Sequence, residues 1–348
     1  MTRIAVVVMA VIGLSACSQS PATPVARVSP SAATPSAATP TVATQGSPVP
    51  TPAQSPNPSP LSTVGFSCRL PIYTEGSVIE DSFITFPDGA ISPTPVGTGG
   101  MYFDRAFSRW LPVPRREVSP DGAGYAYVDY NGTDFVLHVI AVASGKEVQI
   151  PISTQAFSGE PDVLDYSADG IYLVSAFESL QAGLWLVNPS TGALRQLSKD
   201  VYPVFSAGNG VIWVQTVNPA DPYPVMTASS AGTLPDEIDR MDLKAGSKVE
   251  WLYMPGKGLS LMGLDSRGLP LIKTALWGVD ANARMWLVAA PDAPTSIYKG
   301  ELVQSLNGGI TDSHGVWFGS PDGIYLYTNP GYLVRVSDHP GYPANGCF

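Results

Sequence analysis

The side chains that most often perform chemistry in proteins are few and scattered in this chain. Its 348 residues include three histidines and three cysteines. His138 lies in an expected strand, His314 in an expected turn and His339 near the C-terminus, so they share no motif. The metalloprotease pattern HExxH, the CxxC pair, the phosphate-binding P-loop and the GxSxG nucleophile turn do not occur in the sequence. The sequence therefore predicts no catalytic residue, no metal ligand and no cofactor.

Acidic residues recur at turns and do not cluster in the sequence. Asp121, Asp169, Asp265, Asp312 and Asp322 each occupy a short polar turn beside an apolar segment. An Asp side chain at such a position can accept hydrogen bonds from nearby backbone N–H groups, which explains its presence without catalysis. A calcium site built from several such turns is the alternative interpretation. We expect the first of these two roles.

These turns belong to a repeated turn-and-strand pattern that predicts how the chain folds. Its clearest copy is residues 119–128, where Ser-Pro-Asp-Gly precedes an alternating apolar strand. The pattern returns with its glycine at Gly170, Gly210, Gly268 and Gly315. Successive copies are roughly 40 to 60 residues apart, which is the length of one four-stranded blade of a β-propeller.

Further strands and tight turns follow within each repeat. Alternating apolar and polar residues place one set of side chains on each face of a sheet, and glycine supplies the positive φ that tight hairpins require. The block before the repeats, residues 68–114, contains an expected hairpin at 83–91 and expected strands at 101–104 and 109–113. With this block included, the sequence predicts an all-β domain. It is a β-propeller of about six four-stranded blades, or seven if the insertion at 219–235 hides one.

The repeats also resemble a known family of propellers. Ser-Pro-Asp-Gly at 119–122, followed by Tyr-Ala-Tyr at 125–127, is similar to the WD40-like (PD40) repeat of the periplasmic TolB type. Residues 312–319 and 322–325 resemble the repeats of bacterial sensor and regulator propellers. Both resemblances imply a β-propeller over residues 65–348. They imply a fold and no reaction, because propellers carry many unrelated functions.

The N-terminus has the pattern of a bacterial export signal. A basic start precedes an apolar run of about eleven residues, which is too short to span a bilayer. The run ends in Leu14-Ser15-Ala16-Cys17, which resembles the lipobox of bacterial lipoproteins. The resemblance implies that residues 1–16 are a signal peptide and that Cys17 carries lipid, which would hold the protein at the extracytoplasmic face of the cell membrane. An ordinary secretory signal with a chance cysteine is the alternative.

A spacer follows the expected lipid anchor. Residues 17–64 are rich in Pro, Ser, Thr and Ala, with no aromatic residue and almost no charge. Such a stretch buries too little apolar surface to offset its chain entropy, so we predict a disordered, semi-rigid linker. The folded domain is expected to begin at residue 65.

The cysteine count leaves one pair once Cys17 is modified. Cys68 opens the folded region, and Cys347 is the penultimate residue. The two ends of a closed propeller lie side by side, and an exported protein meets an oxidising environment. We therefore predict a disulfide between Cys68 and Cys347 that closes the ring. Two free thiols are the alternative.

Composition narrows the classes of function. The chain is 44% hydrophobic and 14% charged, with a formal net charge of −10. An acidic surface disfavours binding of nucleic acid or anionic lipid through a basic patch. We expect a monomeric, membrane-anchored lipoprotein whose propeller binds or scaffolds a protein or glycan of the cell envelope, through residues that the sequence does not identify. The alternatives are a propeller hydrolase, lactonase or lyase with an axial carboxylate or metal site, and an extracellular sensor or assembly component.

Overall fold

The protein divides into two units, and only the second, Thr51–Phe348, contains described residues. The expected signal peptide, the expected lipidation site at Cys17 and most of the expected linker lie outside them. No helix in the described part of the chain is long and apolar enough to cross a membrane. The computed structural model describes residues 61–76, 79–94, 99–153, 157, 160–175, 183–199, 203–208 (backbone only), 210–218, 220, 234–274, 282–328 and 331–348.

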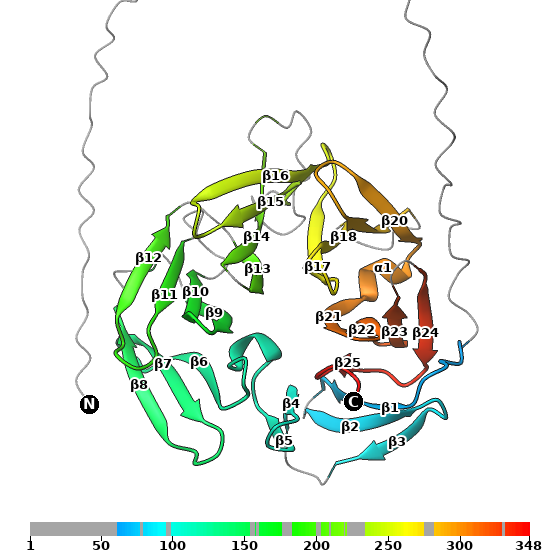
Figure 1. The fold of residues 1–348 in the computed structure, drawn as a ribbon, viewed down its shortest axis with the longest axis horizontal. Coiled ribbons are helices and arrows are strands. Elements are labelled where there is room, and N and C mark those ends of the chain that lie inside the picture. Colours follow the sequence, from blue (N-terminus) through cyan, green and yellow to red (C-terminus); the bar gives the residue numbers. More distant parts are fainter. Residues whose placement is uncertain are drawn as a thin grey trace, which may run out of the picture. The chain divides into compact units, whose positions relative to one another are not determined.

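Antiparallel β-sheets follow one another around a ring within this unit (Figure 1). Among the described residues, five sheets have four strands, one has three strands and one has two strands. Their orders are β25-β1-β2-β3, β4-β5, β6-β7-β8, β12-β11-β10-β9, β13-β14-β15-β16, β17-β18-β19-β20 and β21-β22-β23-β24. The all-β prediction and the propeller prediction are confirmed.

The elements have the following bounds. In the first part of the ring they are β1 (Cys68–Thr74), β2 (Glu80–Phe86), β3 (Ala90–Pro93), β4 (Tyr102–Asp104), β5 (Arg109–Leu111), the 3-10 helix η1 (Arg115–Glu117), β6 (Gly124–Tyr130), β7 (Phe135–Ala141), β8 (Glu147–Ile152), β9 (Pro161–Ser167), β10 (Gly170–Ser175), β11 (Leu184–Val187) and β12 (Leu194–Ser198). In the second part they are β13 (Pro203–Gly208), β14 (Val211–Thr216), β15 (Glu237–Asp242), β16 (Ser247–Tyr253), β17 (Leu259–Leu264), β18 (Pro270–Thr274), β19 (Arg284–Val288), β20 (Pro294–Lys299), α1 (Leu302–Ser305), β21 (Asn307–Asp312), β22 (Gly315–Ser320), β23 (Gly323–Tyr327), β24 (Leu333–Ser337) and β25 (Tyr342–Pro343).

The repeated turn has the same place in five sheets. In four of them it joins the first strand to the second, as β9 to β10, β13 to β14, β17 to β18 and β21 to β22. In the fifth, the turn at Gly122 precedes β6, and the first strand is reduced to a single bridge between Val118 and Tyr125. The sequence repeat is therefore the hairpin that begins each of these sheets.

The first sheet is completed from the other end of the chain. β25 pairs with β1, and the register places Ile72 opposite Pro343 and Tyr73 opposite Tyr342. Its first strand thus comes from the C-terminus, so no hairpin of the repeat precedes β1. This explains why the part of the block that forms the first sheet, residues 68–93, diverges from the other repeats.

A disulfide joins the same two ends. Cys68 and Cys347 are bonded, with their Cα atoms 5.6 Å apart, so the predicted pairing is confirmed. The backbone groups of Arg69 and Phe348 also exchange two hydrogen bonds, with N–O distances of 2.8 and 3.1 Å. Val64, just before the disulfide, is buried against the first and last sheets. The ring is therefore closed by strand pairing and by a covalent bond.

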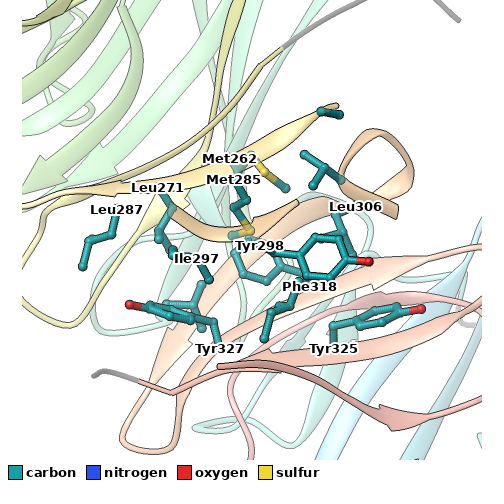
Figure 2. Close-up of a cluster of buried hydrophobic side chains, with 14 residues drawn as sticks. Met262, Leu271, Met285, Leu287, Ile297, Tyr298, Leu306, Phe318, Tyr325 and Tyr327 are labelled. Carbon is teal, nitrogen blue, oxygen red and sulfur yellow. The ribbon is translucent and has the colours of Figure 1, made fainter. Parts of the chain in front are cut away.

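Each sheet packs on the next through a separate cluster of buried apolar side chains. The largest cluster lies between the sheets β17–β20 and β21–β24, where Met262, Met285, Phe318, Tyr325 and Tyr327 meet (Figure 2). Burying an apolar side chain of this size contributes about 1.5–3 kcal/mol, so the contacts between sheets stabilise the ring.

The two-stranded sheet β4–β5 also takes part in the ring. Phe103 and Trp110 pack on Phe83 of the first sheet, while Tyr102 and Leu111 pack against the sheet β6–β8. It therefore fills a seventh position between two larger sheets. In the described part of the chain, six sheets of three or four strands and this hairpin make up the ring.

Candidate functional site

A cavity of about 910 Å³ lies where the ring closes, between the first sheet and the β4–β5 hairpin. Its volume is within the range of ordinary ligand sites. We call it the closure cavity; its lining residues are Arg69, Phe83, Pro93, Thr94, Phe103, Arg105, Ala106, Ser108, Arg109, Trp110 and Phe348. Three separate parts of the sequence therefore contribute to one cavity.

Four aromatic rings form the apolar part of the closure cavity. Phe103 and Trp110 are cross-strand partners in the β4–β5 hairpin, and their rings meet edge-on with centroids 5.4 Å apart. Phe83 contacts Phe103 edge-on at 4.9 Å, and Phe348 stacks on Phe103 at 5.6 Å with an interplanar angle of 7°. Aromatic pairs of this kind add about 0.5–1.5 kcal/mol beyond burial, so the rings hold one another in place.

The tip of the β4–β5 hairpin is held by a buried carboxylate. Asp104 is 2% exposed, and its Oδ1 accepts hydrogen bonds from the backbone N–H groups of Ala106 at 2.8 Å and Phe107 at 3.4 Å. Ser108 then adopts a positive φ of 49°, which returns the chain to β5. The turn thus places Arg105 and Arg109 at its two sides.

Three exposed arginines supply the charge of the closure cavity. The guanidinium carbon of Arg69 lies 3.7 Å from the ring centroid of Phe83, and that of Arg105 lies 5.0 Å from the ring centroid of Phe348. Arg109 Nη1 donates a hydrogen bond to the carbonyl oxygen of Val142 at 3.0 Å.

One carboxylate, the buried Asp104, lies in the same hairpin turn as Arg105 and Arg109. Within the described residues, Arg69, Arg105 and Arg109 make no ion pair, and no carboxylate side chain lines the closure cavity. An arginine side chain remains charged at any physiological pH. In a chain of net charge −10, this cavity is a positive site on an acidic protein.

The disulfide explains how the closure cavity is assembled. Arg69 and Phe348 are the residues immediately after Cys68 and Cys347, so the bond and the backbone pairing bring their side chains to one place. The sequence signals the cysteine pair. It does not signal the cavity, because the other lining residues are ordinary strand and turn residues.

The three histidines do not come together. His138 Nδ1 lies 2.6 Å from Glu147 Oε1, and its ring stacks on Tyr127. His314 packs against Phe66 beside the last sheet, and the backbone N–H of His339 donates to Ser337 Oγ. Among the described residues, no group of three His, Cys, Asp or Glu side chains could hold a metal ion.

Three of the five turn aspartates cap backbone N–H groups as expected. Asp121 accepts from Ala123; Asp265 accepts from Arg267 and Leu269; and Asp312 accepts from His314 and Gly315.

The other two turns use a serine. The backbone N–H groups of Asp169 and Asp322 donate to the hydroxyl groups of Ser167 and Ser320. In these two turns the aspartate takes part through its backbone N–H and not through the predicted side-chain bond.

A pair of acidic side chains at the start of β15 is a second polar site. Asp239 is fully buried, accepts a hydrogen bond from Thr216 Oγ1 at 3.1 Å and pairs with Lys248 Nζ at 2.5 Å. Glu237 Oε2 accepts a hydrogen bond from Asn218 Nδ2 at 2.9 Å. Burial, followed by the neighbouring Asp239, raises the pKa of Glu237 above its usual value. A carboxylic acid beside a carboxylate can exchange protons.

Comparison with known proteins shows similarity of fold only. No protein-family model and no curated protein matches the sequence. TolB from Acinetobacter baumannii is 13% identical with a TM-score of 0.42, over 77% of this chain and 65% of TolB. The tricorn protease is 13% identical with a TM-score of 0.41, over 79% of this chain and 27% of the protease. Oligogalacturonate lyase in complex with manganese is 11% identical with a TM-score of 0.41, over 78% of this chain and 74% of the lyase. This chain thus spans less than two thirds of TolB and of the tricorn protease.

Proposed function

We propose that this protein is a lipid-anchored binding protein on the extracytoplasmic face of the bacterial cell membrane. Its propeller holds a protein or glycan of the cell envelope in the closure cavity. The lipobox at Leu14-Ser15-Ala16-Cys17 supports the anchor, and the Pro-rich linker supports a domain held away from the membrane.

The observation that carries the binding role is the composition of the closure cavity. Apolar lining with a few convergent polar groups is the ordinary character of ligand sites. Here four aromatic rings and three arginines, which have no ion-pair partner among the described residues, meet in one place. Guanidinium groups that have no ion-pair partner and lie beside aromatic rings are typical of binding surfaces. At such surfaces Arg, Trp and Tyr often supply most of the binding energy.

The anchor is tested by replacing Cys17. In the producing bacterium, the wild-type protein should sediment with membranes, and its mature N-terminal peptide should carry the mass of acyl chains. Cys17→Ala should move the protein to the soluble fraction. A wild-type protein that is soluble, or that keeps an unmodified Cys17, would show that the lipobox is not used.

The binding site is tested by photocrosslinking in intact cells. A photoreactive amino acid replaces Ala106, which lines the closure cavity, or Ala245, which does not. The two positions are matched, because each is an exposed alanine in a turn capped by an aspartate, Asp104 or Asp242. Adducts that form from position 106 and not from position 245 support the proposal. Equal adducts at both positions, or none at position 106, contradict it.

A second candidate function is catalysis by the pair Glu237 and Asp239. It is favoured by the raised pKa of Glu237 beside a buried carboxylate, which is an arrangement of active sites that use general acid catalysis. β15 is the third strand of its sheet, so these carboxyl groups are not on the strand nearest the ring axis, where the alternative of a propeller enzyme would place an axial site (Figure 1). If Glu237→Gln leaves every glycan- or ester-cleaving activity of the purified protein unchanged, this function is refuted.

A further inference from the structure

We propose that the ligand of the closure cavity is an acidic peptide segment of a protein partner, in which carboxylates flank an apolar residue. This inference rests on the proposed binding function and names the class of its ligand. It follows from how the arginines are held, from which surfaces they leave accessible and from the charge of the rest of the chain.

The arginines are arranged to meet carboxylate groups. A guanidinium group that lies over an aromatic ring keeps its planar edge of N–H donors directed away from that ring, and this edge matches a carboxylate in a two-bond geometry. The guanidinium carbon of Arg69 lies 3.7 Å from the ring centroid of Phe83, close enough for this arrangement, and that of Arg105 lies 5.0 Å from the ring centroid of Phe348. Because their rings belong to one aromatic cluster, two carboxylates of one ligand can be bound together.

The same contacts favour a peptide over a sugar. A sugar ring would stack on a free aromatic face, but Phe83, Phe103 and Trp110 are less than a tenth exposed. The remaining ring, Phe348, is 39% exposed, is stacked on Phe103 and has Arg105 5.0 Å from its centroid. At the tip of the β4–β5 hairpin, Ala106 and Ser108 line the closure cavity with short, exposed side chains. Short side chains leave the backbone of the tip accessible to a ligand. Backbone carbonyl groups accept hydrogen bonds from the N–H groups of a peptide.

An exposed phenylalanine lies at the tip of the same hairpin, outside the lining of the closure cavity. Phe107 lies between Ala106 and Ser108 at the tip of the hairpin and is 40% exposed. A bound segment that extends past the hairpin tip would place an apolar residue against Phe107. The recognition therefore combines charged pairs at Arg69 and Arg105 with one apolar contact at the hairpin tip.

The charge distribution of the chain supports the same ligand. A protein of net charge −10 repels acidic partners over most of its surface. A local site of three arginines, which make no ion pair among the described residues, attracts acidic partners to one position, while the acidic remainder of the protein repels them. Such complementarity sets specificity and depends on ionic strength.

The test measures binding of labelled probes to the full chain carrying Cys17→Ala, by fluorescence anisotropy. The probes are a ten-residue peptide of Glu and Gly with one central Phe, the same peptide with Gln for every Glu, and a labelled hexamer of galacturonate. We expect the Glu peptide to bind at least tenfold more tightly than the Gln peptide, and high salt to weaken it.

Variants of the closure cavity then locate the binding. R69Q/R105Q should weaken the Glu peptide at least tenfold. R284Q should not, although Arg284 also lies over an aromatic ring, Trp286, outside the cavity. Ala106→Glu should weaken binding of the Glu peptide, whereas Ala106→Lys should not. If both variants weakened binding equally, misfolding and not charge would be the cause.

The outcomes distinguish this inference from the proposed function. Equal binding of the Glu and Gln peptides, or Glu-peptide binding unaffected by R69Q/R105Q, overturns the inference. Arginine-dependent binding of the galacturonate hexamer without binding of the Glu peptide also overturns it, but leaves the proposed binding function intact. If neither probe binds, the inference fails, and the crosslinks from position 106 then decide the proposed function separately.

Discussion

Removal of the Cys68–Cys347 disulfide tests the closure of the ring most directly. The change is C68A/C347A in a full chain that also carries Cys17→Ala, so that no other cysteine remains. The bond closes a loop with a sequence separation of 279 residues, and the chain-entropy relation for a loop of this length gives about 5.6 kcal/mol. Measured values fall below this limit, so we expect the free energy of unfolding to decrease by about 2–5 kcal/mol.

Other contacts still join the two chain ends when the disulfide is absent, so the loss of stability can be as small as about 2 kcal/mol. Without the disulfide, β25 still pairs with β1, Arg69 still exchanges backbone hydrogen bonds with Phe348, and the backbone N–H of Cys347 still donates to Asp312 Oδ2 at 2.7 Å. The ring should therefore fold, but its closure should open at lower denaturant concentration. Because Arg69 and Phe348 line the closure cavity, opening should also weaken ligand binding.

Urea unfolding monitored by tryptophan fluorescence measures the effect. Reductant should destabilise the chain with both cysteines by the same amount as the double substitution, and it should not affect the double variant. A decrease below about 1 kcal/mol in both experiments would show that the pairing of the chain ends is sufficient without the bond. It would refute the stabilising role of the disulfide.

Three further predictions concern the hairpins and a buried acid. Gly315→Ala should destabilise the protein by more than about 3 kcal/mol in urea unfolding, because Gly315 has a φ of 143° and a Cβ there would overlap the carbonyl oxygen of Tyr327. Gly308→Ala, at a φ of 64° with open space around it, should cost only about 1 kcal/mol, and equal losses would contradict the steric reason. Asp312→Asn should cost about 1–3 kcal/mol, because Oδ2 accepts from both Trp317 Nε1 and the N–H of Cys347, and an amide leaves a donor unpaired. The control is Asp242→Asn in an exposed turn, where Oδ1 alone accepts both bonds. The amide oxygen of Asn can replace it, so the loss should be smaller than at Asp312, and equal losses would exclude this account. Burial raises the pKa of Glu117 to about 7, so the folded state keeps a proton that the unfolded state releases above pH ~4.5, and stability falls as the pH rises from there to about 7. Glu117→Gln should therefore be more stable than wild type by up to about 3 kcal/mol at pH 8 and equal at pH 4.5, and a difference that does not vary with pH would exclude this cause.

The periodic part of the fold was predictable from local sequence. The turn glycines at Gly170, Gly210, Gly268 and Gly315 are signals that act within one hairpin, and the structure places a hairpin at each of them. The expected strands at 101–104 and 109–113 were found as β4 and β5. Local signals of this kind depend on backbone conformation and side-chain alternation, which neighbouring residues determine.

The inner strands were harder to predict. Strands β9 and β13 were not predicted from the sequence, and neither was the place of β25 in the first sheet. β25 spans only Tyr342–Pro343 and is extended because β1 pairs with it. A two-residue segment has no period to read, so its strand depends on contacts made after the ring closes.

The residues themselves determined a repeated all-β chain and a cysteine pair at its two ends. Tertiary structure alone decided that Arg69, Arg105 and Phe348 share one cavity, because these residues are separated by long stretches of sequence and carry no common motif. Closure of a ring brings its first and last residues together whatever their types. The set of residues that lines the closure cavity is therefore determined by the order of the sheets around the ring. No local pattern of the sequence predicts it.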